Sequence, residues 1–206
     1  NIYSAPVEGG EEVQLTDSAV NSIFALSYFP EDDRILYLSD EGGNEIYHIY
    51  MRDLDGSVRD LTPWKNARSV FYGWTYDRDQ FVFGSNKRDP KFMDIYMMDI
   101  KTLEPRMIYL NDSGYSLGAI SNDDRYLAFA RMITEHNSEM YLYDRETGKT
   151  AHLSPHEGNV NFLPNDFSPD SKYLYYLTDE GCEYLYVKRL EIGTGETESV
   201  EKAQWD

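Results

Sequence analysis

The sequence repeats with a period in the mid-forties, and this period constrains the fold more than any other feature. A similar turn precedes a short apolar run four times, and its landmark residues are Asp33, Asp79, Asp124 and Ser171. Successive landmarks lie 46, 45 and 47 residues apart. A steady period of this length is typical of a repeat architecture in which each copy forms one supersecondary unit.

Each copy contains several short strand-like runs and no helical pattern. The fourth copy has an apolar run at 173–177, a turn at 178–181 and a second run at 184–187. The 18 Tyr and 9 Phe residues of the chain suit half-buried strands. Repeats of this length that consist of four strands are propeller blades. The sequence therefore predicts an all-β fold, a β-propeller of four-stranded blades.

The register of the repeat predicts about four and a half blades in a partial propeller domain, 1–206. The half blade is predicted at 1–17, because residues 2–16 align with the second half of a copy. The full blades are predicted at about 20–64, 67–112, 114–157 and 159–201. A propeller protects its strands by closing the ring, so an incomplete ring has an open edge. We therefore expect further blades in the parent protein and a missing natural N-terminus.

The net charge of −18 excludes some partners. Nucleic acid is not expected, because binding to phosphates needs a basic surface. Membrane insertion is not expected either, since no apolar run approaches the length of a membrane span. An acidic surface favours solubility, and it also attracts cationic peptides. The single cysteine, Cys182, leaves the compartment open between bacterial periplasmic or exported and cytoplasmic.

One loop stands out from its counterparts in the other copies. Residues 85–92 place Lys87, Arg88 and Lys91 together in an otherwise acidic chain. A solvated loop is the simplest interpretation. The alternative is a docking loop for a second domain or for a carboxylate, since loops on a rigid scaffold often carry contacts.

Residues Gly114 to Gly118 match G-x-S-x-G, the motif of a serine nucleophile elbow. That motif functions only on a sharp strand-to-helix turn that exposes the hydroxyl. The repeat register places Gly118 opposite Gly73, where each leads into an innermost strand, and a turn follows instead of a helix. Ser116 is therefore expected to be structural.

The histidines and acidic pairs do not predict a site. His152 and His156 have i, i+4 spacing, but Pro155 lies between them in a strand-to-loop transition, so a zinc site is not supported. His48 lies inside a predicted strand. Residues 53–56 resemble the start of a calcium loop, although a hairpin turn explains them. We expect no catalytic residue, metal site or cofactor site in this chain.

The unit at 168–181, SPDSKYLYYLTDEG, resembles the WD40-like propeller repeat of TolB-type proteins, and the resemblance covers the whole chain. Other stretches resemble the propeller of bacterial prolyl-oligopeptidase-type (S9 family) serine peptidases, of the dipeptidyl and acylaminoacyl peptidase kind. These stretches are 59–63, 83–94, 142–148 and 166–170. The resemblance implies an N-terminal propeller that caps an α/β-hydrolase domain with a Ser-Asp-His triad.

The resemblance implies a gating role for this chain. The hydrolase domain lies outside the sequence, so no residue here is assigned to the triad. The implied partners are that hydrolase domain, within the same polypeptide, and peptide substrates. The aromatic-flanked acidic motif by which dipeptidyl peptidases hold the substrate amino terminus is not found here.

Two other functions stay open. The first is a TolB-like cell-envelope propeller that binds a protein partner without catalysis. The second is a free-standing sugar-binding or lyase propeller, and the missing clusters of His and acidic metal ligands count against the lyase. The peptidase interpretation predicts a hydrolase domain downstream of the propeller. The TolB-like interpretation predicts a signal peptide and a small domain upstream.

Overall fold

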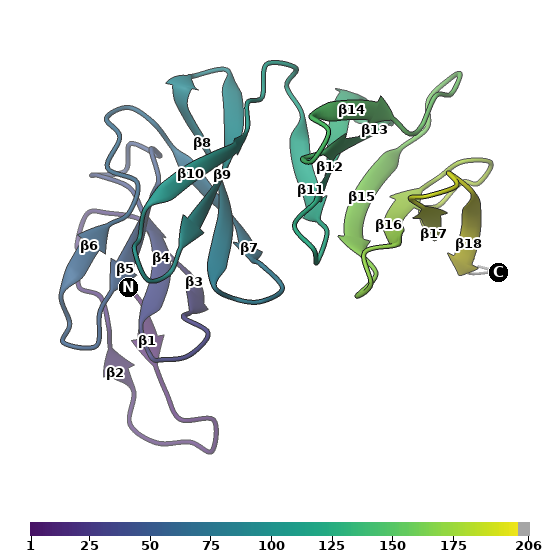
Figure 1. Ribbon diagram of the computed structural model, residues 1–206. Helices are drawn as coiled ribbons and strands as arrows, with labels where there is room; N and C mark the ends of the chain where they lie inside the picture. The colour runs from purple at the N-terminus through teal and green to yellow at the C-terminus, as the bar shows by residue number, and fades with distance from the viewer. Residues whose placement is uncertain (202–206) are drawn as a thin grey trace. The chain divides into compact units, whose positions relative to one another are not determined.

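The computed structural model of the chain describes residues 1–201, and every regular element in this range is a β-strand (Figure 1). The strands form one two-stranded sheet and four four-stranded sheets. The predicted all-β fold of four-stranded blades is therefore confirmed, while residues 202–206 of the predicted domain lie outside the described range. Among the described residues, no helix is long and apolar enough to cross a membrane.

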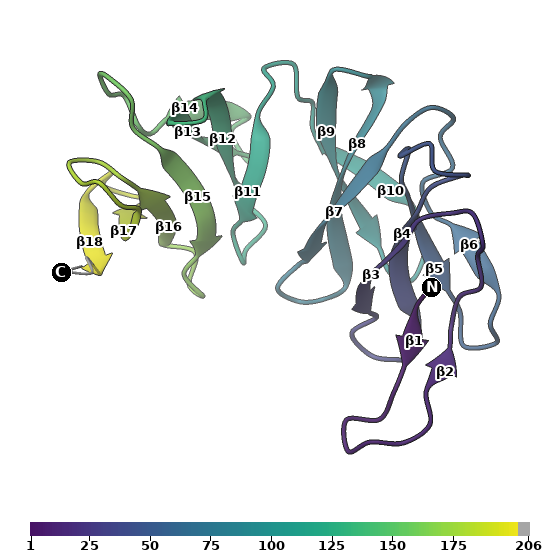
Figure 2. The ribbon, with the colours of Figure 1, turned by 180° about the vertical axis from the view of Figure 1, so that it is seen from behind.

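The sheets follow one another along the chain, and strands that are consecutive in sequence are neighbours in each sheet (Figure 2). The half blade consists of β1 (Tyr3–Ser4) and β2 (Val13–Gln14). Blade 1 consists of β3 (Ile23–Tyr28), β4 (Ile35–Ser39), β5 (His48–Arg52) and β6 (Val58–Asp60). Blade 2 consists of β7 (Ser69–Trp74), β8 (Gln80–Asp89), β9 (Phe92–Asp99) and β10 (Pro105–Tyr109).

Blades 3 and 4 repeat the same up-and-down order. Blade 3 consists of β11 (Ser116–Ile120), β12 (Tyr126–Thr134), β13 (Asn137–Asp144) and β14 (Lys149–His152). Blade 4 consists of β15 (Phe162–Phe167), β16 (Tyr173–Thr178), β17 (Tyr186–Glu191) and β18 (Thr197–Glu201). The chain divides into two compact units. One holds the half blade with blades 1 and 2, and the other holds blades 3 and 4 together with residues 74–77.

The second strands of blades 1 to 3 are covered on both faces, which explains their nearly continuous apolar sequences. In β4, Ile35, Leu36 and Tyr37 are each at most 5% exposed, although successive side chains point to opposite faces. In β16 of blade 4 only one face is fully covered, since Leu174 and Tyr176 are at most 2% exposed and the residues that alternate with them are partly buried. Strands of this kind need a packed neighbour on each side, and a neighbouring blade supplies one.

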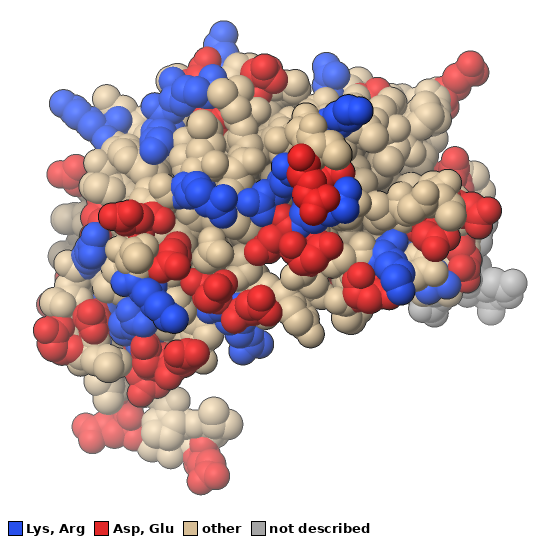
Figure 3. Space-filling model, viewed as in Figure 1, with Lys and Arg blue, Asp and Glu red and all other residues tan. Residues whose placement is uncertain are grey.

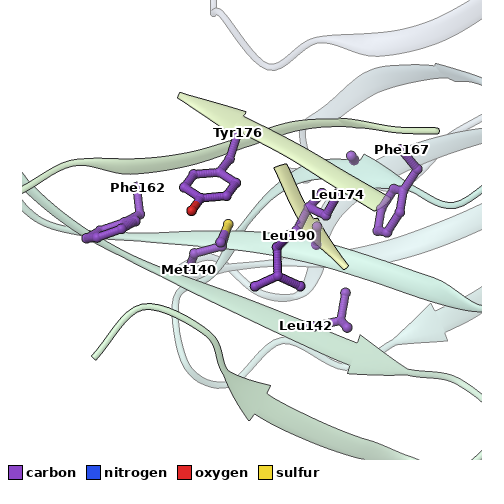
Figure 4. Packing of buried hydrophobic residues seen from close by; sticks show 9 residues of the cluster. Met140, Leu142, Phe162, Phe167, Leu174, Tyr176 and Leu190 are labelled. Atoms are coloured by element: carbon purple, nitrogen blue, oxygen red, sulfur yellow. The ribbon is translucent and has the colours of Figure 1, made fainter. Parts of the chain in front are cut away.

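The core between blades 3 and 4 shows this packing directly (Figure 4). Met140 and Leu142 of β13 face the side chains of the next blade. Those side chains are Phe162 and Phe167 of β15, Leu174 and Tyr176 of β16, and Leu190 of β17. Burying one side chain of this size contributes about 1.5–3 kcal/mol, so the interface is a large part of the stability of this unit.

The segment 85–92 is not the loop that the sequence predicts. Strand β8 continues to Asp89 and β9 begins at Phe92, so only a two-residue turn remains between them. The pairing of Asp89 with Phe92 carries the ladder past the pair Ser85–Asp94, which corresponds to Ser39–His48 at the end of the hairpin in blade 1. Blade 3 has the same extension, because β12 continues to Thr134. The middle strands of blades 1 and 4 have only five or six residues each.

Acidic and basic side chains lie next to one another over much of the face drawn in Figure 3, despite the net charge of −18. In blade 3 the Arg125 guanidinium donates to both carboxylate oxygens of Asp144, at 3.2 and 2.8 Å. These hydrogen bonds lower the pKa of Asp144 to about 2. The ion pair joins the turn before β12 to the end of β13.

Acid is expected to weaken the unit that contains this ion pair. The folded-state pKa of Asp144 lies below its ordinary value of 3.8, so its contribution to stability is present above that value. The contribution is lost as the pH falls through about 2. Urea unfolding of the wild type and of Asp144→Asn should therefore show a stability gap at pH 6 that shrinks towards pH 2. A gap that stays constant with pH would contradict this assignment.

Candidate functional site

The β8–β9 hairpin holds the three basic residues that the sequence singled out. The Lys87 ammonium lies 3.8 Å from the centre of the Trp64 ring and 4.7 Å from that of Tyr96. An ammonium over an aromatic face is attracted by the ring quadrupole. Burial against these rings lowers the pKa of Lys87, and the negative charge of Asp94 opposes that shift. Lys87 is therefore held in place by the rings of Trp64 and Tyr96.

Arg88 is also committed to a contact within the hairpin. Its guanidinium donates two hydrogen bonds of 2.8 Å to the two carboxylate oxygens of Asp94. The Asp94 side chain is fully buried, whereas that of Arg88 is 34% exposed. The hydrogen bonds to Asp94 raise the pKa of Arg88. A buried carboxylate needs such a partner, because desolvation without one is very costly.

Lys91 differs from the other two residues. It occupies the turn of the hairpin, where its backbone N–H donates to the Asp89 carboxylate at 2.9 Å and its side chain is exposed. The structure thus fixes Lys87 and Arg88 by internal contacts and presents Lys91 at the tip. Docking through this hairpin stays a prediction.

The G-x-S-x-G match has a structural explanation. Ser116 begins strand β11 and pairs with Ala130 of β12, so it is not on a strand-to-helix elbow. A Cβ atom on Gly118 would lie 2.3 Å from the carbonyl oxygen of Pro164 in β15. Glycine is required there by close packing between two blades.

The histidines make separate contacts. His152 stacks on Tyr141 with ring centroids 4.6 Å apart, while His156 Nε2 lies 3.0 Å from the Asn137 side-chain oxygen. His48 Nδ1 lies 2.7 Å from the Asp60 carboxylate. Within residues 1–200 no group of three or more His, Cys, Asp or Glu side chains is placed to hold a metal ion.

Sequence reasoning missed two adjoining hollows over blade 1. Their volumes are about 280 and 400 Å³, and both are bordered by Ser39 and Tyr50. The smaller hollow is also lined by the His48–Asp60 pair. Burial, together with the charge of Asp60, raises the pKa of Tyr50 to about 12, so its hydroxyl is neutral and can donate. A position-by-position comparison of the repeat copies is the sequence analysis that could have pointed to these hollows.

Comparison with known proteins places the chain among propellers. No protein-family model matches it. The dipeptidyl aminopeptidase BIII of Pseudoxanthomonas mexicana is 25% identical over 200 residues, which cover 95% of this chain and 29% of that enzyme. The chain thus spans less than a third of the length of this curated relative.

Two solved structures illustrate the shared fold. A prolyl endopeptidase superimposes with a TM-score of 0.70 at 15% identity, over 98% of this chain and 33% of that one. TolB from Acinetobacter baumannii superimposes with a TM-score of 0.58 at 20% identity, over 95% of this chain and 47% of that one. The resemblance of this chain to TolB-type and prolyl-oligopeptidase-type propellers is confirmed at the level of the fold.

Proposed function

We propose that this chain is the gating, substrate-selecting propeller of a serine peptidase of the prolyl oligopeptidase, dipeptidyl or acylaminoacyl peptidase type. The observation that carries the proposal is the alignment of 95% of the chain with less than a third of a dipeptidyl aminopeptidase. Catalysis would belong to an α/β-hydrolase domain of the same polypeptide. Short peptides would be the substrates.

The physical role that we propose for the propeller is exclusion. Its blades are rigid sheets with closely packed interfaces, and a ring of such blades over a hydrolase site admits short or unfolded peptides but no folded protein. Ser116 is not the nucleophile in this proposal, because it lies in a strand and Gly118 is required for packing. The acidic surface would favour cationic peptides, and salt would weaken that preference.

The proposal is tested with the polypeptide encoded by the complete open reading frame. A fluorophosphonate probe should label it covalently, and it should hydrolyse short peptides while leaving folded proteins intact. The segment 1–206 produced alone serves as the control and should not be labelled. A full polypeptide that is neither labelled nor active would favour the TolB-like binding propeller instead. The similarity to TolB does not favour that alternative, since it reports the shared fold.

We also propose that Lys91 contacts a carboxylate of the second domain. Its exposed side chain lies at the tip of the basic hairpin, whereas Lys87 contacts Trp64 and Arg88 contacts Asp94. Lys91→Glu in the full polypeptide should lower the affinity between domains and raise hydrolysis of larger peptides by a few-fold. The matched control is Lys101→Glu, in the exposed turn after β9. Equal effects of the two substitutions would exclude a specific contact.

A further inference from the structure

The face of blade 4 that points away from blade 3 is partly exposed within the described residues. Leu174 and Tyr176 of β16 point towards blade 3, where they join the core shown in Figure 4. Successive side chains of a strand point to opposite faces, so Tyr175 and its cross-strand neighbour Arg189 lie on the other face. Val187, two residues before Arg189 in β17, lies there as well. These three residues, Tyr175, Val187 and Arg189, are the outer face of blade 4.

The repeat identifies the residues of the other blades that correspond to Tyr175 and Arg189. The second strand of every blade contains an apolar residue, a variable residue and an aromatic residue in succession, at 35–37, 81–83, 127–129 and 174–176. Tyr175 is the variable residue of blade 4. In the other three blades the variable residue and the residue opposite it in the third strand are at most 8% exposed. These pairs are Leu36–Met51, Val82–Met97 and Ala128–Leu142.

The outer face of blade 4 differs from these buried pairs, because Tyr175, Val187 and Arg189 are all only partly buried. The cover is seen directly in blade 3, where Ala128 and Leu142 belong to the core that blade 4 completes. Val187 gives the same contrast, since its equivalents are at most 1% exposed. These equivalents are Ile49, Ile95 and Met140.

Arg189 is charged, whereas the equivalent residues are methionine or leucine. Its guanidinium donates two hydrogen bonds to one carboxylate oxygen of Glu198, at 3.3 and 2.9 Å, and lies 4.5 Å from the centre of the Tyr173 ring. The hydrogen bonds to Glu198 raise the pKa of Arg189. An arginine that is paired with a carboxylate and stacked on a ring is suited to an interface. The charge of Arg189 is therefore compatible with a covering layer.

We infer that the outer face of blade 4 is the docking surface for a further four-stranded blade of the same polypeptide. The contact repeats the one between blades 3 and 4, in which the middle strands of one blade pack against the sheet of the next. Arg189 stays paired with Glu198 at the edge of this interface. The inference does not rest on the proposed function, because sheet packing of this kind requires no hydrolase domain.

A second copy of the chain fits this face less well. The net charge of −18 opposes association of two copies, since like-charged chains repel one another. A further blade of the same polypeptide is tethered, so it docks without the entropic cost of bringing two molecules together. The dipeptidyl aminopeptidase that aligns with this chain is long enough for further blades, because the aligned region covers only 29% of it.

Photo-cross-linking in the polypeptide encoded by the complete open reading frame tests the inference. The photoreactive residue p-benzoylphenylalanine, which is close to tyrosine in shape, replaces Tyr175. Irradiation should join it to the next repeat copy, within about 50 residues after Asp206. The same residue in place of Tyr184, which is 55% exposed, serves as the control and should give at least about tenfold less of this product.

A stability measurement provides a second, independent test in the same polypeptide. Val187→Glu would bury an unpaired carboxylate under the covering blade, so it should lower the unfolding midpoint of the propeller by at least about 6 °C. The matched control is Val58→Glu in β6, where the side chain is 55% exposed, and it should shift the midpoint by less than about 2 °C.

Each outcome supports or overturns the inference. A cross-link from position 175 to the next repeat copy, together with the larger effect of Val187→Glu, supports it. A cross-linked product of twice the mass would assign the face to a second copy. A cross-link to a hydrolase domain, no cross-link, or equal midpoint shifts in Val187→Glu and Val58→Glu would also overturn it. If the polypeptide with the photoreactive residue at position 175 fails to fold, the two valine variants decide.

Discussion

Replacing Arg88 by methionine is expected to lower the midpoint of thermal unfolding by roughly 6–12 °C. The reason is the effect of the substitution on Asp94, the ion-pair partner of Arg88. Asp94 has no exposed surface and accepts both guanidinium hydrogen bonds at 2.8 Å. Removing the guanidinium takes two charge-assisted hydrogen bonds from a desolvated carboxylate inside the hairpin, and breaking a buried ion pair by removing one partner is strongly destabilising. Differential scanning calorimetry measures the shift.

Two further variants make this result specific. Lys91→Met, three residues away and exposed, removes a positive charge from the same hairpin and should change the midpoint by less than about 2 °C. The double variant Arg88→Met with Asp94→Leu removes both charges and should recover most of the loss, since apolar replacement of a whole buried pair is often neutral. A double variant no more stable than Arg88→Met would disprove the explanation.

Replacing Gly118 by alanine is expected to destabilise the unit of blades 3 and 4 by about 3 kcal/mol, at the upper end of the usual range for overpacking. The new Cβ would lie 2.3 Å from the Pro164 carbonyl oxygen and 2.8 Å from Pro164 Cγ. The nearest of these atoms belongs to the backbone, so no side-chain rotation relieves the contact. Strand β11 or strand β15 must shift, and the core between the two blades shifts with it.

Urea unfolding at equilibrium measures this effect, with Gly193→Ala as the matched control. Gly193 lies between β17 and β18, where an added Cβ would meet no atom within 4 Å. Its replacement should change the free energy of unfolding by less than about 0.5 kcal/mol. Equal stability of the two variants would show that β11 and β15 do not approach each other as described. It would also leave Gly118 of the G-x-S-x-G match without a packing explanation.

The strands were predictable because their signals are local. The apolar run at 173–177 predicts a strand, and the structure has β16 at Tyr173–Thr178. The hairpin turn predicted at 53–56 ends on Gly56, which has a positive φ angle. The repeat period then specified sheets of four strands, because copies of one supersecondary unit must stack to bury their apolar faces.

The candidate sites were less predictable, because they depend on which side chains the fold brings together. Residues 85–92 read as a polar loop, yet Arg88 hydrogen-bonds to the buried Asp94 and the Asp89–Phe92 pair extends the ladder. The Lys87 ammonium lies over Trp64, which belongs to the link between β6 and β7.

The amino-acid sequence by itself determined the class of fold, the number of strands in each copy and the absence of a serine elbow at Ser116. The alternation of apolar residues and the choice of turn residues act between near neighbours, and the repeat period is visible in the sequence itself. All three can therefore be read along the chain. Only the tertiary structure decided which basic residues are held by contacts within the blade and why glycine stands at position 118. Those features depend on which side chains and backbone atoms the fold brings together.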